Sequence, residues 1–141
     1  MKNIFKIFTP SIMILIFIYL IGCSDTAPYG AKVIMPADVT IAGSGSILFR
    51  INAIVVDEDD NPLNGMDIQF LYACPATTCT LYKNTTSNTP GSSVALPYNT
   101  NTDASGVATV WAEVGPSYGD YLISADIGVA SDQTAITFSS T

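Results

Sequence analysis

Apolar and polar residues alternate with a period of two in several stretches of this 141-residue chain. Successive side chains of a β-strand point to opposite faces, so this pattern predicts strands with one buried face. Clusters of Gly, Pro, Asn and Asp interrupt the alternation about every ten residues, which is typical of an all-β sandwich. No stretch after residue 23 shows the 3.6-residue apolar periodicity of a helix. The expected strands contain Ile47–Val56, Ile68–Tyr72, Ala108–Ala112, Tyr121–Ile127 and Thr134–Phe138.

The N-terminus follows a different pattern. Lys2 and Lys6 give a positive start, and an unbroken apolar run of ten residues follows at positions 12–21. A membrane-spanning helix needs about 20 such residues, so this run is too short to be a transmembrane anchor. A charged start, a short apolar run and a small residue at its end are typical of a secretory signal. We therefore expect residues 1–22 to be an export signal peptide that is cleaved.

The end of this signal, Leu20-Ile21-Gly22-Cys23, resembles the lipobox of bacterial lipoproteins. The resemblance implies that a diacylglyceryl group is attached to the sulfur of Cys23 and that cleavage occurs just before it. Two or more acyl chains hold a protein stably on a membrane. Ser24, by resemblance to the sorting rule of enteric bacteria, favours the outer membrane. We expect a lipid-anchored protein of the cell envelope whose only attached group is this covalent lipid.

Cleavage would leave 141 − 22 = 119 residues, enough for one domain with a modest core. This mature chain has three basic residues against twelve acidic ones, a formal net charge of 3 − 12 = −9. Such a charge excludes nucleic acid as a partner and excludes electrostatic binding to anionic lipid. We expect a signal peptide at 1–22, a lipidated N-terminus and tether at 23–31, and a sandwich domain at 32–141.

Cys74 and Cys79 are the two cysteines that remain once Cys23 is lipidated, and four residues separate them. In an exported protein a pair this close predicts a disulfide across a tight loop. The alternative is a metal or redox site. The chain has no histidine to complete a metal site, and redox motifs favour a two-residue spacer. The surrounding segment, Ala73–Pro97, is rich in Thr and Asn and is expected to be a long loop.

The order of these elements resembles the group 1 bacterial immunoglobulin-like (Big-1) domain of the invasin and intimin type. The first half of the resemblance rests on Val55-Val56-Asp57, Asn61-Pro62-Leu63 and Gly65. The second half rests on Thr-Asp-Ala-Ser-Gly-Val-Ala-Thr-Val at 102–110 and Gly-Asp-Tyr-Leu-Ile-Ser-Ala at 119–125. The resemblance implies an immunoglobulin-like antiparallel β-sandwich of about seven strands with a structural or adhesive role. It covers most of the mature chain, but the family's tandem repeats are missing.

Catalysis has little support in the residues. The absence of histidine excludes Ser-His-Asp and Cys-His sites, so we expect no enzyme. Asp57, Asp59 and Asn61 have the spacing of the first three ligands of a calcium-binding EF-hand loop and are weak metal candidates. Pro62 then takes the position of the required glycine, and Ile68 that of the bidentate glutamate. These failed positions favour the alternative, a solvated acidic turn.

Trp111 is out of phase with the inward positions of its strand, which would place it on the outer surface. An exposed tryptophan sometimes marks an interface. The alternative is that Trp111 packs against a covering loop, which would bury its large side chain. Tyr121 is in phase with Ile123 and Ala125 and is expected in the core.

The sequence therefore predicts a non-enzymatic, lipid-anchored module that contacts a protein in the envelope or on another cell. A second hypothesis is a surface module that binds calcium or carbohydrate through the acidic turn or the Ala73–Pro97 segment. A third is an accessory subunit of an envelope or secretion complex.

Overall fold

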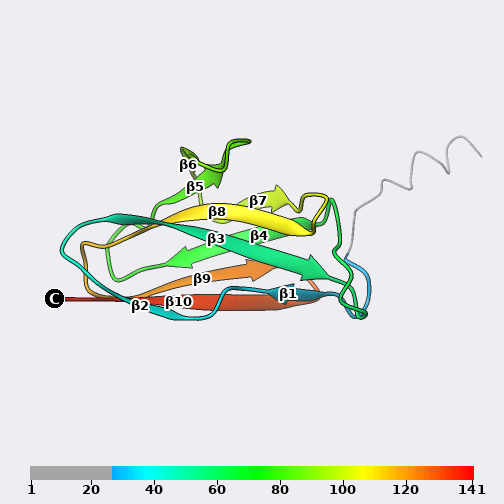
Figure 1. The fold of residues 1–141 in the computed structure, drawn as a ribbon, viewed down its shortest axis with the longest axis horizontal. Helices are drawn as coiled ribbons and strands as arrows, with labels where there is room; N and C mark the ends of the chain where they lie inside the picture. Colours follow the sequence, from blue (N-terminus) through cyan, green and yellow to red (C-terminus); the bar gives the residue numbers. More distant parts are fainter. Residues whose placement is uncertain (1–26) are drawn as a thin grey trace, which may run out of the picture.

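The computed structural model describes residues 27–141, and this part of the chain consists of strands and turns in two stacked sheets (Figure 1). No helix that could cross a membrane is found in this part. The strands are β1 (Lys32–Ile34), β2 (Val39–Ala42), β3 (Ile47–Val56), β4 (Asp67–Ala73), β5 (Leu81–Asn84), β6 (Pro90–Val94), β7 (Tyr98–Asn101), β8 (Val107–Val114), β9 (Gly119–Asp126) and β10 (Ser131–Ser139).

Each sheet has five strands. The first has the order β1-β3-β8-β5-β6 and the second the order β2-β10-β9-β4-β7. All neighbouring strands are antiparallel except β2 and β10, which run parallel. The parallel pair arises because the chain crosses between sheets after β1 without reversing direction. The expected immunoglobulin-like sandwich is confirmed, with this one parallel pair at its edge.

The strand count differs from the expected seven, because the described residues form ten strands. The segment Ala73–Pro97, expected to be a loop, contains β5 and β6, and β7 follows directly. These strands are short and mostly polar, so their sequence lacks the alternation that marks a strand with a buried face. Their pairing with distant strands stabilises them instead, since β5 pairs with β8 about 30 residues away (Tyr82 with Trp111).

The core lies between the sheets and contains the inward side chains that the alternation predicts. Along β8 every second residue is buried, from Ala108 to Val114. Ala108 and Ala125 are almost fully buried, as is Tyr121, whose hydroxyl donates to the Ser117 carbonyl oxygen at 2.7 Å. The largest fully buried side chains are Tyr121, Phe70, Phe138, Ile68, Leu81, Ile123 and Ile136.

The first strand, β1, begins at Lys32, and two residues just before it also pack against the core. Ala27 and Ala31 are buried in the same apolar cluster as the core, and the Ala31 amide donates to the Pro28 carbonyl oxygen at 3.1 Å. Ala27 and Ala31 of the expected tether thus pack against the domain, whereas Tyr29 between them is 98% exposed. The expected signal peptide and Cys23 lie outside the described residues.

The described chain enters at one end of the sandwich and finishes at the other (Figure 1). We call the end that holds the turns 57–66, 102–106 and 127–130 the entry end. The far end holds the turns 43–46, 74–80 and 115–118. The ten residues of β3 run between the two ends, a length of about 33 Å at 3.3 Å per residue.

Gly106 is the tightest point of the entry end. Its φ is +70°, and an added Cβ would lie 2.6 Å from the Val55 carbonyl oxygen. Gly65 has a similar φ of +72° but open space around it. Comparing substitutions at the two glycines therefore separates the cost of a positive φ from the cost of a steric clash.

We predict that Gly106→Ala lowers the free energy of unfolding by about 2–4 kcal/mol, because it adds a clash to the unfavourable φ. Gly65→Ala should cost only about 1–2 kcal/mol from the φ alone. Urea denaturation of both variants and the parent measures the difference. Equal losses in the two variants would contradict the close approach at Gly106.

Candidate functional site

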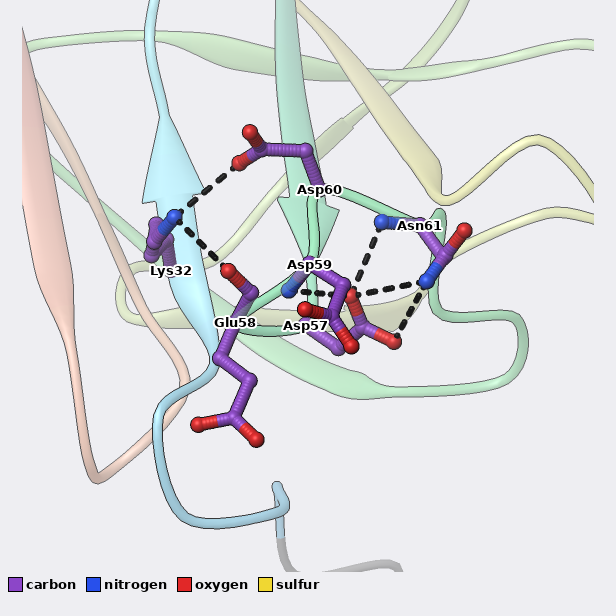
Figure 2. Close-up of polar contacts among 6 residues, drawn as sticks. All are labelled: Lys32, Asp57, Glu58, Asp59, Asp60 and Asn61. Atoms are coloured by element: carbon purple, nitrogen blue, oxygen red, sulfur yellow. Dashed lines mark hydrogen bonds and ion pairs between the residues drawn. The ribbon is translucent and has the colours of Figure 1, made fainter.

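Asp57 organises the acidic turn that follows β3 (Figure 2). Its Oδ1 accepts hydrogen bonds from the backbone amides of Asp59 at 2.9 Å and Asn61 at 2.8 Å. The Asn61 Nδ2 also donates to Oδ1 at 3.2 Å and to Oδ2 at 3.1 Å. A side chain that accepts from amides two and four residues ahead is the usual lock of a tight turn.

The charges of this turn are also paired with a neighbouring strand. Lys32 of β1 donates to Asp60 Oδ1 at 3.0 Å and to the Glu58 carbonyl oxygen at 3.4 Å (Figure 2). Hydrogen bonds from Asn61, with help from the Asp59 amide and Lys32, hold the pKa of the Asp57 carboxyl below its ordinary value of 3.8.

The weak calcium candidates Asp57, Asp59 and Asn61 thus lie in one turn, where N–H donors occupy both carboxylate oxygens of Asp57. Asn61 turns its amide nitrogen, not its oxygen, toward Asp57. In the described part of the chain, no three His, Cys, Asp or Glu side chains form a group that could hold a metal ion. In this geometry, hydrogen bonds within the turn account for the positions of Asp57 and Asn61.

Thr102 of the 102–106 turn contacts the segment that follows the acidic turn, while Asp103 holds its own turn together. The buried Thr102 hydroxyl donates to the Leu63 carbonyl oxygen at 2.6 Å and accepts from the Met66 amide at 2.9 Å. Asp103 Oδ1 accepts from the amides of Ser105 and Val107. Both residues belong to the motif that the sequence singled out, but the sequence did not show what they contact.

The predicted disulfide between Cys74 and Cys79 is confirmed, with the two Cα atoms 5.7 Å apart. It closes the loop between β4 and β5 at the far end. Pro75 in this loop faces Gly119, where an added Cβ would lie 3.2 Å from the proline ring. The Pro75 ring therefore fixes the shape of this loop where it lies beside the start of β9.

Trp111 lies half-buried on the outer face of the first sheet. Arg50 of β3 and Tyr82 of β5 flank it in register. Its Nε1 donates to Asn84 Oδ1 at 3.0 Å, where the β5–β6 hairpin begins. This contact fixes the position of the indole, which stays partly exposed beside the hairpin.

Sequence reasoning missed the neighbours of Trp111, because they come from separate strands. The sequence did carry one signal, the alternation along each strand. Arg50, like Trp111, falls between inward-facing positions of its strand and is therefore expected on the outer face. Tyr82 donates to Glu113 Oε2 at 3.0 Å, and this bond raises the pKa of the tyrosine. The outer face of the first sheet is therefore a connected polar surface around one tryptophan.

No protein-family model matches the sequence, and no curated protein sequence matches it. Among solved structures, bacterial invasin, described as an integrin-binding protein, matches with a TM-score of 0.51 at 16% identity, over 78% of this chain and 19% of invasin. A β-glycosidase from Bacteroides vulgatus matches with a TM-score of 0.50 at 15% identity, over 79% of this chain and 14% of the glycosidase. The adhesin InvE of Yersinia pseudotuberculosis matches with a TM-score of 0.48 at 17% identity, over 79% of this chain and 32% of InvE.

The class of protein that these findings define is an immunoglobulin-like β-sandwich. The invasin comparison confirms the fold implied by the sequence resemblance. The chain spans about a fifth of the length of invasin.

We predict that the free energy of unfolding falls as the pH drops through the lowered pKa of Asp57. A carboxyl with a lowered pKa stabilises the fold fully above its unfolded pKa of about 3.9, and this contribution is lost below the folded pKa. Asp57→Asn keeps an acceptor oxygen but does not titrate, so its unfolding free energy should depend less on pH below about 4. Urea denaturation across the acid range measures the slope.

Asp59→Asn is the matched control, because the Asp59 side chain accepts no hydrogen bond from any described residue. It should keep the pH dependence of the parent. An unchanged slope in Asp57→Asn would contradict the role assigned to this carboxylate.

Proposed function

We propose that this protein is a non-catalytic, lipid-anchored immunoglobulin-like module of the bacterial cell envelope, with a structural or adhesive role through protein contacts. The observation that carries the proposal is the small number of residues between the lipobox-like cysteine and the sandwich. Only residues 24–26 separate Cys23 from Ala27, which is already buried against the core. Fully extended, this connection reaches about 15 Å.

A short connection would bring the entry end close to the membrane and direct the far end outward. The entry end carries eight of the twelve acidic residues, in its turns and at the adjoining strand ends. These are Asp57, Glu58, Asp59, Asp60, Asp67, Asp103, Asp126 and Asp132. An anionic lipid surface repels such an end, so the lipid anchor rather than charge would hold the module in place.

The comparisons support the adhesive part of the proposal at the level of the module. Invasin is an integrin-binding protein, and its chain is about five times longer than the matched part. The same fold also forms a small part of a glycosidase, so the fold alone does not assign a function. The absence of histidine excludes the common nucleophilic and histidine-based zinc sites. Ser24 after the cysteine favours the outer membrane as the location.

We predict that Cys23→Ser abolishes acylation and leaves residues 1–22 attached, because the modified sulfur is the substrate of the expected cleavage. Labelled palmitate and the intact mass of the protein measure both effects in the native host. Replacing Cys74 and Cys79 together with serine is the matched control and should keep the label. Continued labelling of Cys23→Ser would overturn the anchor.

The adhesive part has a separate test that uses the two ends of the sandwich. We predict that a photo-crosslinking amino acid at Thr77, exposed in the far-end loop, yields a discrete adduct with another envelope or surface protein. The same probe at Asp59, exposed at the entry end, should yield none, because that end faces the membrane. Electrophoresis of irradiated cells reads out both positions. Adducts from Asp59 alone, or from neither position, would contradict contact through the far end.

A further inference from the structure

A polar groove of about 400 Å³ lies beside the outer face of the first sheet. Its walls are the surface of β3 and β8, the β5–β6 hairpin, and β7 with the 102–106 turn. Figure 1 shows this hairpin standing away from the body of the sandwich. The volume falls within the range of about 300–1,000 Å³ that is common for small-molecule sites. Among the described residues that line it, Val107 alone lacks a polar side-chain group.

Two asparagines in the groove, Asn52 and Asn88, are held in fixed orientations by hydrogen bonds to neighbouring side chains. Asn52 Oδ1 accepts from the Thr109 hydroxyl at 2.9 Å. Asn88 Oδ1 accepts from Asn84 Nδ2 at 3.0 Å and from Arg50 Nη2 at 3.4 Å. In each residue the oxygen is used internally, and Nδ2 has no partner within residues 27–141. Each therefore offers a fixed N–H donor.

In Asn101 the amide nitrogen, not the oxygen, is used internally. Its Nδ2 donates to Asp67 Oδ1 at 2.6 Å and to the Gly65 carbonyl oxygen at 3.3 Å. Its Oδ1 has no partner in the described part of the chain and is offered as an acceptor. The groove thus presents donors and an acceptor at set positions, with the hydroxyls of Thr100 and Tyr98 beside them. Side chains locked before binding lose little entropy when a ligand arrives.

The charges in the groove point to a neutral ligand. Its lining has one guanidinium, that of Arg50, and one carboxylate, that of Asp103. Backbone amides of its own turn already occupy one oxygen of that carboxylate. The excess of acidic residues in the chain disfavours binding of an anion. A single carboxylate with one oxygen already hydrogen-bonded would bind a cation only weakly. The remaining polar groups are amides and hydroxyls.

We propose that this groove binds a neutral saccharide. Sugar hydroxyls both donate and accept hydrogen bonds, and amide and hydroxyl side chains match them in both directions. The half-buried Tyr98 ring and Val107 give an apolar patch for the C–H face of a sugar ring. The inference goes beyond the proposed function, because the groove includes the 102–106 turn of the entry end, whereas the proposed protein contact lies at the far end.

Trp111 provides a built-in reporter for the groove. It is the one tryptophan of the chain, and its Nε1 is bonded to Asn84, which lines the groove and in turn contacts Asn88. A ligand that engages Asn88 should therefore change the fluorescence of Trp111.

The experiment titrates the full chain, purified in the sugar-free detergent lauryldimethylamine oxide, with maltotriose, mannotriose and triacetylchitotriose. We expect at least one of them to shift Trp111 fluorescence saturably, with a dissociation constant of about 1 mM or below. Calorimetry with the same trisaccharide checks the fluorescence result. A shift with none of the three would overturn the proposal.

Three isosteric variants with the same charge change test the site. Asn52→Asp and Asn88→Asp keep the internal acceptor oxygen and remove the free donor, so each should weaken binding about 2- to 10-fold. Asn99→Asp is the control, because Asn99 is an exposed residue of β7 outside the groove. Equal weakening in all three variants, or a preference for the anionic sialyllactose or for a polar peptide, would overturn the assignment.

The result is separable from the anchor. Sugar binding is measured on purified protein in detergent. If Cys23→Ser kept its acyl label, the conclusion about the groove would therefore be unaffected. A groove that binds no sugar would equally leave the acylation and crosslinking results standing.

Discussion

The placing of small beside large inward side chains within each sheet is the constraint on which the rest of the structure depends. In the first sheet Ala112 lies in register between Phe49 and Leu81. In the second sheet Ala125 is the register partner of Phe70. A methyl group beside a large side chain fills the interior without voids at the sheet spacing of about 10 Å. Since strand side chains alternate, this inward order also decides which residues face outward.

The same packing sets the turns of the entry end. Gly106 lies so close to the Val55 carbonyl oxygen that the 102–106 turn has no room for a side chain there. The Thr102 hydroxyl satisfies buried backbone groups of the neighbouring segment, and Asp57 satisfies the amides of its own turn. The polar residues of this end therefore pair with the backbone, which accounts for carboxylates that resemble metal ligands in the sequence.

How far the sequence predicts the structure depends on whether a feature is local. The strands β3, β4, β8, β9 and β10 were predictable, because each carries its own alternating apolar face. The disulfide was predictable because its cysteines are close in sequence. The strands β5 to β7 were not, since residues such as Asn84 and Ser93 are typical of turns and only pairing across the fold makes them part of strands. The role of Asn52, Asn88 and Asn101 is equally hidden, because only strand pairing and the turn of the β5–β6 hairpin bring them to one groove.

The β5–β6 hairpin connects the core to this outer surface. Leu81 is fully buried and fixes the start of β5, which pairs with β8 only as far as Lys83. Between Tyr82 and Asn84 the ladder with β6 shifts register. Such irregularities bend a strand, and here the next polar contact is the side chain of Asn84 with Trp111 instead of a backbone ladder with β8. The early part of β8 is left uncovered on that side, so the groove exists because the hairpin departs from the sheet after its last buried anchor.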